Sequence, residues 1–279
     1  MGRPHRRGSE TGIHHVMNRG VDHQPIFFAD DDRKELGRRL TAIHDAFSVT
    51  TLAYCLMGNH LHLALCAPDG VLPDAMHHLT SVYSRHLNDR LGRDGPLFRG
   101  RYHSIPVESD SYLLWLTRYV HRNPLDIAGV TSPRDYRWSS YRSYLGLRPA
   151  PRFLDRQPVL DLVGGRIDEL AAITEDRAPI RPRTVSDLVG LVRCARAVED
   201  LTESAPGDRP EANIDRTLLV LLAARTDDPS LARLIEAALG PRPTKAARQA
   251  ARRAEGRRCD DPVVSRALRW IELQLSGAT

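Results

Sequence analysis

The chain has 279 residues, enough for one large domain or two of ordinary size, and 41% of them are hydrophobic, which permits a packed core. A formal net charge of +5 and a pI near 9.2 favour a nucleic-acid partner without requiring one. No apolar run approaches the roughly 20 residues that cross a bilayer. The four cysteines are scattered and form no Cys-x-x-Cys pair. We therefore expect no membrane span and no disulfide framework, and a reducing, cytoplasmic location.

The first half of the chain alternates between strand and helix patterns. Leu36, Leu40 and Ile43 recur at helical spacing within residues 30–47, and three aspartates begin that segment, where the helix dipole favours anions. The other predicted elements are a strand at 12–19, a hairpin at 48–57 and 60–67, a helix at 73–91, a basic strand or strand pair at 97–107, and a helix at 110–123. This order predicts an α+β fold, an antiparallel sheet with helices covering one face.

The predicted hairpin carries the most informative residues. Two apolar segments meet at Gly58-Asn59, and His60-Leu61-His62 follows directly. Side chains alternate along a strand, so the histidines share one face and the leucines after them supply a core face. An i, i+2 pair is roughly 6.6 Å apart at Cα, close enough for two imidazoles to converge on one metal ion. A third ligand must come from another element.

The helix at residues 110–123 offers such a ligand. Tyr119 and Asn123 are i, i+4 neighbours on one face. Pro124 disfavours helical geometry at the residue before it, so the helix should end near Asn123 and leave its amide at a terminus. His121 points about 200° away from Tyr119 around the helix. A phenol nucleophile and an oxygen ligand would then lie side by side.

These motifs resemble a known family. A strand-borne His-hydrophobic-His followed by Tyr-x-x-x-Asn on a helix resembles the HUH endonucleases with a single catalytic tyrosine. The sequence of residues 11–147 resembles the REP-associated tyrosine transposases. The segments that carry the likeness are Met17-Asn18-Arg19-Gly20, Tyr54 to His62, Phe98-Arg99-Gly100-Arg101-Tyr102 and Arg118 to Leu125. Gly58 stands where the family often has proline, which loosens the turn and leaves the ligands unchanged.

The resemblance implies a ferredoxin-like HUH fold and a reaction. Tyr119 would attack a phosphate of single-stranded hairpin DNA, forming a 5′-phosphotyrosine link that a 3′ hydroxyl later reverses, so that strands are cleaved and rejoined during transposition. His60, His62 and Asn123 would hold Mg²⁺ or Mn²⁺, and imidazole ligands favour the latter. The family also implies a homodimer in which either subunit supplies the tyrosine. Tyr102 and Tyr112 are the other candidates for nucleophile in this region.

Several basic residues are candidates for DNA contacts or for ordinary surface charges: Arg19, Arg99, Arg101 and His103. Residues 133–146 mix aromatic rings with arginines, a mixture that suits stacking on single-stranded nucleic acid. The alternative is an aromatic cap that closes the core.

A change in pattern after residue 150 indicates a second domain. We assign residues 1–150 to the transposase-like domain, 151–183 to a proline- and arginine-rich linker, and 184–279 to an all-α domain. Residues 230–240 and 243–253 have helix-turn-helix spacing and are similar to the DNA-binding domain of bacterial replication initiators. Four basic residues of the second helix would contact duplex DNA there: Lys245, Arg248, Arg252 and Arg253. The alternative is a solvated helix of a bundle.

The sequence leaves two other classes of function open. A His-x-His metal hydrolase would need further histidine and acidic ligands on successive strands, and the helical second half offers no obvious set. A transposase-derived DNA-binding regulator would use the basic helices without turnover. Intact His60, His62, Tyr119 and Asn123 argue against a decayed site.

Overall fold

The computed structural model describes residues 9–175, 182, 184–202, 218–219, 221–223, 225–226, 228–239 and 262–276. The chain divides into two compact units, Met1–Asp176 and Arg177–Thr279. Among the described residues, no helix combines the length and the apolar character that crossing a bilayer requires.

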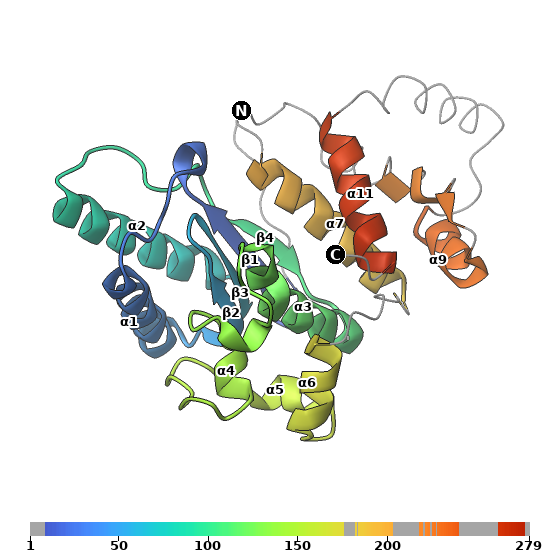
Figure 1. The fold of residues 1–279 in the computed structure, drawn as a ribbon, viewed down its shortest axis with the longest axis horizontal. Helices are drawn as coiled ribbons and strands as arrows, with labels where there is room; N and C mark the ends of the chain where they lie inside the picture. Colours follow the sequence, from blue (N-terminus) through green and yellow to red (C-terminus); the bar gives the residue numbers. More distant parts are fainter. Residues whose placement is uncertain are drawn as a thin grey trace. The chain divides into compact units, whose positions relative to one another are not determined.

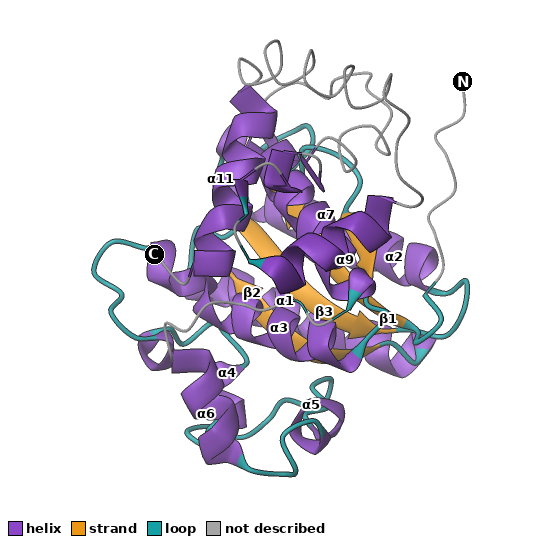
Figure 2. Ribbon diagram, turned by 90° about the vertical axis from the view of Figure 1, so that its right-hand side faces the viewer, coloured by secondary structure: helices purple, strands orange, loops and turns teal. Residues whose placement is uncertain are grey.

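Unit 1 is built around a four-stranded antiparallel sheet (Figures 1 and 2). Its strands are β1 (Ile13–Arg19), β2 (Thr50–Leu56), β3 (His60–Cys66) and β4 (His103–Pro106), in the spatial order β2-β3-β1-β4. β1 pairs with β3 so that Met17 lies opposite His62 and Arg19 opposite His60. The α+β class and the antiparallel sheet predicted from the sequence are confirmed.

Two helices cover one face of the sheet. They are α1 (Asp30–Phe47) and α2 (Leu72–Leu91), and they pack against each other (Figure 1). Leu61, Leu63 and Leu65 are at most 1% exposed and belong to the core that these helices close, as the alternation along β3 predicted. The leucine face therefore fixes which way the histidines of the same strand point.

The opposite face is covered as well. Helix α3 (Asp110–Arg122) packs against β2 and β3 from the other side, and His62 is only 2% exposed beneath it. The sequence predicted helices on one face alone, which would leave the histidine face bare, and that part of the prediction is wrong. Leu113, Leu116 and Val120 supply the apolar stripe of α3, and burying that stripe requires the helix to lie on the sheet.

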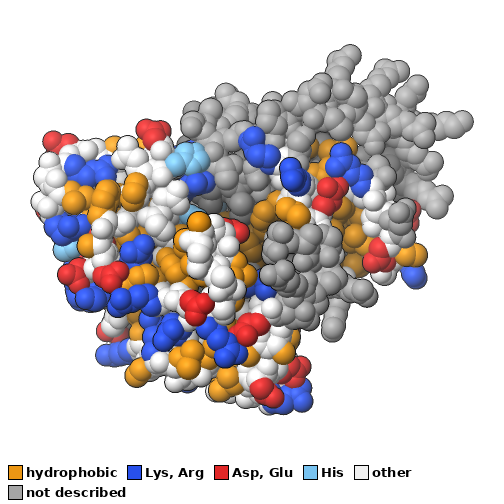
Figure 3. Space-filling view, viewed as in Figure 1, with side chains coloured by type: hydrophobic (Ala, Val, Ile, Leu, Met, Phe, Trp, Pro, Cys, Tyr) orange, Lys and Arg blue, Asp and Glu red, His pale blue; other side chains and the backbone are white. Residues whose placement is uncertain are grey.

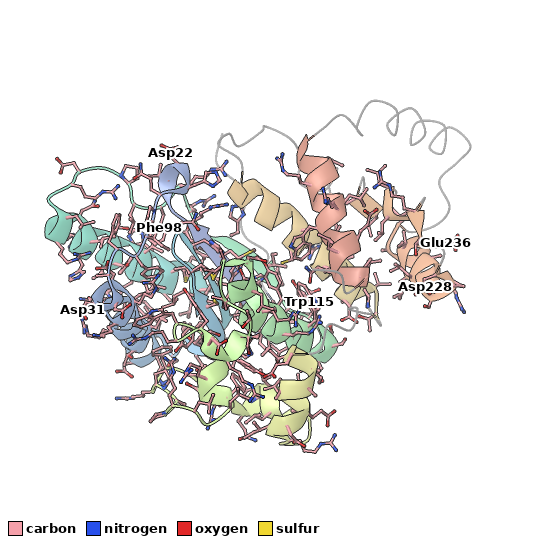
Figure 4. The ribbon with its side chains drawn as sticks, in the orientation of Figure 1. Asp22, Asp31, Phe98, Trp115, Asp228 and Glu236 are labelled. Atoms are coloured by element: carbon pink, nitrogen blue, oxygen red, sulfur yellow. The ribbon has the colours of Figure 1, made fainter. Side chains whose placement is uncertain are left out.

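Residues 97–102 do not form the long strand predicted from the sequence. Only His103–Pro106 is strand, and the preceding segment makes a single bridge between Phe98 and Gly20. Leu97 and Phe98 are consecutive yet both lie in the core of α1 and α2 (Figure 4 labels Phe98). A regular strand sends adjacent side chains to opposite faces, so it cannot bury both in one core.

The boundary of the first unit lies beyond the predicted residue 150. After α4 (Tyr141–Tyr144), two short helices, α5 (Gln157–Asp161) and α6 (Ile167–Glu175), pack against α3. Val159 and Leu170 are fully buried. The predicted linker at 151–183 is therefore folded through residue 175, because its apolar side chains pack into the core of unit 1. Its prolines and arginines had indicated a linker instead.

The segment at 133–146 is mainly an aromatic cap. Tyr141 and Tyr144 are fully buried, and the hydroxyls of Tyr136 and Tyr144 donate to the carbonyl oxygens of Leu56 and Leu52 at 2.7 Å. Trp138 is partly buried, with the guanidinium of Arg137 over its ring at 4.7 Å. The hydroxyls of Tyr136 and Tyr144 tie this segment to β2, whereas that of Tyr141 donates to Glu175 at 2.6 Å. Three 3₁₀ turns complete the unit: Val21–His23, Asn123–Asp126 and Pro133–Asp135.

The described part of unit 2 is helical. It contains α7 (Val185–Thr202), α9 (Pro229–Leu239) and α11 (Pro262–Ser276), with α7 packed against the other two. The buried faces carry Leu188, Val192, Ile235 and Ile271. The first helix of the predicted helix-turn-helix corresponds to α9. The second, with Lys245, Arg248, Arg252 and Arg253, lies outside the described residues.

The first turn of α1 makes a testable prediction about stability. The Asp32 carboxylate is 1% exposed, accepts from the backbone N–H groups of Phe28 and Ala29 at 2.7 and 2.8 Å, and pairs with Arg90 of α2 at 2.7 Å. Asp32→Ala leaves two donors and a cation without their acceptor, so we expect a loss of about 2–4 kcal/mol in the free energy of unfolding by urea denaturation.

Asp31→Ala is the matched control for this experiment. The Asp31 side chain is 81% exposed, and its ion pair among the described residues is with Lys34 in the next turn. Its removal should leave the free energy of unfolding nearly unchanged, because solvent screens an exposed ion pair. Equal losses in the two variants would contradict the role assigned to Asp32.

Candidate active site

The predicted ligands meet between β3 and the end of α3. His60 Nε2 lies 3.5 Å from Asn123 Oδ1, and the rings of His60 and His62 are perpendicular with centroids 5.2 Å apart. The amide of Asn123 is oriented by its Nδ2, which donates to the carbonyl oxygen of Tyr119 at 3.3 Å. α3 ends at Arg122, with Asn123 as its C-cap, as predicted from Pro124. The helix terminus thus places an amide oxygen beside the first histidine.

Tyr119 lies against the second histidine of the same chain. Its ring centroid is 5.3 Å from that of His62 and 5.9 Å from that of His15, with the rings near perpendicular in both cases. On the other side Trp115 stacks on it, 5.4 Å away and 11° from parallel, and Tyr112 continues the stack (Figure 4 labels Trp115). The tyrosine ring is held between a stacked indole and two imidazole edges, which restricts its rotamers.

The donor set fits a divalent metal ion. Donors about 2.1 Å from a common ion lie about 3–4 Å apart, and the 3.5 Å between His60 Nε2 and Asn123 Oδ1 falls in that range. Two imidazoles and an amide oxygen are ligands that Mn²⁺ accepts. Within the part of the chain that the structure describes, no group of three or more His, Cys, Asp and Glu side chains is arranged to hold a metal. The oxygen donor that lies beside the histidine pair is the amide of Asn123.

Two arginines, Arg19 and Arg99, bring positive charge to one side of this set of donors. Arg19 on β1 lies opposite His60 on β3 in the strand register. Its charge contributes to lowering the pKa of His60 and of His62. The pKa of Arg19 is itself lowered, first by burial and then by the charge of Arg99, whose backbone N–H donates to the carbonyl oxygen of Arg19. An anion near these guanidiniums would relieve their repulsion.

The predicted DNA-contacting residues are placed unevenly. Arg19 and Arg99 lie together near the histidines. In the strand register, His103 on β4 lies opposite Met17 on β1, which in turn lies opposite His62 on β3. The side chains of His103 and His62 are therefore on the same face of the sheet. Arg101 is exposed in the segment before β4. On the face of unit 1 seen in Figure 3, Lys and Arg atoms are interspersed with Asp and Glu, so that face shows no single-signed surface.

Buried histidines have strongly lowered pKa values. Burial lowers the pKa of His15 and of His121 to about 3, and burial followed by the charge of Arg19 lowers that of His60 to about 4. The pKa of His62 falls well below its usual value, through burial and then through His60, His15 and Arg19. At neutral pH these rings are uncharged, the form that binds a metal ion.

These pKa values predict acid sensitivity. In the unfolded chain the same histidines titrate near 6.5, so below that pH the unfolded state binds more protons and the folded state loses stability. We expect the free energy of unfolding to decrease as pH falls from 6.5 to 5, with a slope for each histidine that starts near half of its limiting value of about 1.4 kcal/mol per pH unit and approaches that value by pH 5. Chemical denaturation at several pH values measures this slope.

His121→Gln provides an internal check on that slope. His121 is fully buried on the side of α3 away from Tyr119, where its Nε2 lies 2.8 Å from Ser140 Oγ. Glutamine can keep a hydrogen bond to the serine but does not titrate. In this variant the free energy of unfolding should decrease less steeply with falling pH, by the contribution of one histidine. A free energy of unfolding that is flat between pH 6.5 and 5 in the wild type would contradict the account.

The structure separates the tyrosine candidates and adds residues that the sequence did not single out. Among the described ring contacts, it is Tyr119, rather than Tyr102 or Tyr112, that touches His62. His15 and Trp115, which frame Tyr119, were not predicted. The side chains of His15 and Met17 are two residues apart on β1 and so point to the same face of the sheet. Because Met17 lies opposite His62 on β3, that face is the one that carries the histidines. That signal is visible only once the strand register is known.

A comparison with protein families agrees with the motifs. Residues 10–123 match the family model described as transposase IS200 like, so the resemblance inferred from the motifs is confirmed over that part of the chain. The matched residues include His60, His62, Tyr119 and Asn123.

One similar solved structure is described as the REP-associated tyrosine transposase bound to a REP hairpin. It shares 13% sequence identity with a TM-score of 0.45, over 56% of this chain and 93% of that one. No curated protein matches the sequence.

Proposed function

We propose that the chain cleaves and rejoins single-stranded DNA with Tyr119 as the nucleophile. The observation that carries the proposal is the contact of the Tyr119 ring with His62 in the same chain, one helical turn from Asn123, which lies beside His60. The match of residues 10–123 to the IS200-like transposases supports the same reaction. Because this contact lies within one chain, we propose that Tyr119 acts with the histidines of its own subunit.

The reaction balances without a nucleotide cofactor. The Tyr119 oxygen bonds to phosphorus as the phenol gives up its proton, the bond from phosphorus to the 3′ oxygen breaks, and that oxygen takes up a proton. The DNA stays joined through its 5′ phosphate to the tyrosine. Attack by another 3′ hydroxyl reverses these steps and transfers the strand. One phosphodiester is exchanged for another, so the bond energy is conserved.

His60, His62 and Asn123 would hold Mn²⁺ or Mg²⁺ through two ring nitrogens and one amide oxygen. When bound, the ion would draw charge from a phosphate oxygen and favour attack on phosphorus. Arg19 and Arg99 would contact the DNA phosphates, where their mutual repulsion is offset by negative charge. Trp115 would hold the ring of Tyr119 at the angle from which its oxygen attacks.

A hairpin oligonucleotide with single-stranded flanks tests the proposal, because the resemblance over residues 11–147 is to transposases of such repeats. Purified protein is incubated with the labelled oligonucleotide and Mn²⁺, and denaturing gels reveal any protein–DNA adduct. An adduct that requires the divalent ion supports the proposal. Salt-sensitive DNA binding without any adduct, on a panel of hairpins, would favour a DNA-binding regulator instead.

A further inference from the structure

Each of the two candidate histidine ligands has its Nδ1 atom against a second side chain. His62 Nδ1 lies 3.1 Å from His15 Nε2, and His60 Nδ1 lies 2.8 Å from Asn59 Oδ1. Neither His15 nor Asn59 belongs to the set proposed to hold the metal. Both contact that set through an Nδ1 atom, and at His60 the other ring nitrogen, Nε2, lies by Asn123.

The contact at His60 leaves a single arrangement of protons. The Asn59 amide is oriented by its Nδ2, which donates to the carbonyl oxygen of His23 at 3.2 Å, so Oδ1 is the atom that faces His60. A carbonyl oxygen only accepts, and Nδ1 of His60 must then carry the proton. The Nε2 atom of that ring keeps its lone pair on the side of Asn123.

The contact at His62 allows two arrangements. Two neutral imidazoles joined by one hydrogen bond share a single proton between the facing nitrogens. If His62 donates from Nδ1, its Nε2 has the lone pair that a metal ion needs. If His15 donates instead, the proton of His62 sits on Nε2 and that ring cannot be a ligand.

We propose that His15 is a positioning residue that accepts from His62 Nδ1 and so holds the His62 ring in the tautomer that binds metal, as Asn59 does for His60. This inference rests on the proposed function, since it concerns the same ligands. Both histidines are buried, at 0% and 2% exposure, so water does not replace either partner. Outer partners of this kind typically change metal affinity by about 10–100-fold when removed.

The fold explains why His15 can act on both halves of the site. In the β1–β3 register His15 pairs with Ala64 and Met17 with His62, so His15 is the diagonal neighbour of His62 on one sheet face. Its ring also meets the Tyr119 ring edge-on, with centroids 5.9 Å apart and planes at 73°. One side chain thus orients a ligand and limits the position of the nucleophile.

Two measurements on the full-length protein test the inference. Nitrogen-15 NMR of histidine side chains in the metal-free wild type reports the tautomer directly, and we expect the proton of His62 on Nδ1. Calorimetric titration with Mn²⁺ should then show an affinity lower by about 10–100-fold in His15→Leu, which removes the acceptor and keeps an apolar side chain in the buried position. Circular dichroism confirms that the variants are folded.

His15→Gln and His14→Leu are the matched variants. The glutamine carbonyl oxygen can accept from His62 Nδ1, so Mn²⁺ affinity should return to within about 3-fold of wild type. His14 is the next residue on β1 but contacts Ser104 at 3.1 Å, and its replacement should leave Mn²⁺ affinity unchanged. Rescue by glutamine distinguishes an acceptor from a residue that only fills space.

Three outcomes would overturn the inference. The first is a metal-free wild type with the His62 proton on Nε2. The second is a folded His15→Leu variant that binds Mn²⁺ as the wild type does while His62→Ala does not, which leaves the proposed function standing. The third is a wild type that binds no Mn²⁺, in which case the metal centre is absent and the inference falls with it.

Discussion

Tyr119→Phe should abolish the covalent protein–DNA adduct, lowering its yield by at least about 100-fold, to the detection limit of a denaturing gel. Phenylalanine keeps the stack on Trp115 and the edge contacts with His62 and His15, so the ring stays in place and only the attacking oxygen is lost. Binding of the hairpin should therefore persist while the chemistry stops. A gel-shift assay beside the adduct gel measures both.

Tyr112→Phe is the matched control, because it removes the same atom from the same helix. Tyr112 stacks on the far side of Trp115 and is 2% exposed. Its variant should form the adduct at a yield within about 3-fold of wild type, since the oxygen that it lacks is not the nucleophile. An adduct that survives Tyr119→Phe and disappears in Tyr112→Phe would move the nucleophile to the other tyrosine.

His62→Ala should lower Mn²⁺ affinity and adduct yield together, each by at least about 100-fold. His62 lies between the other parts of the site: its ring touches Tyr119, His60 and His15. Removing it takes one of three donors from the proposed set and opens a space beside the nucleophile. Titration calorimetry and the adduct assay measure the two losses.

His121→Gln controls for the loss of a buried histidine. His121 lies on α3 two residues from Tyr119 but contacts Ser140, Tyr141 and Tyr144 on the opposite side of the helix. Mn²⁺ affinity in this variant should stay within about 3-fold of wild type, because His121 is not a donor. If His62→Ala keeps wild-type Mn²⁺ affinity, the histidine pair is not the metal site.

Much of the site was predictable because its parts obey short periodicities. The period of two along β3 puts the histidines on the face opposite Leu61 and Leu63, and the i, i+4 spacing puts Asn123 one turn after Tyr119. The proline after Asn123 marked the end of α3. These relations are local, so the sequence contains them without any knowledge of tertiary structure.

The remaining features depend on long-range packing. The proximity of His15 to His62 follows from the register of two strands 40 or more residues apart, which no local pattern encodes. Residues 97–102 look like a strand by composition, yet consecutive burial of Leu97 and Phe98 prevents it. Residues 151–175 look like a linker by composition. They are folded because the helices that contain Val159 and Leu170 pack against α3, a contact that local sequence does not reveal.

Peptide mapping of the purified adduct tests the central claim most directly. Arg118 and Arg122 flank Tyr119, so trypsin releases it in the tetrapeptide Tyr119-Val120-His121-Arg122, whereas Tyr102 and Tyr112 share a separate peptide that ends at Arg118. Mass spectrometry after nuclease digestion should find the residual nucleotide phosphate on the tetrapeptide. The same mass on the peptide of Tyr102 and Tyr112, or on any other peptide, would contradict the account.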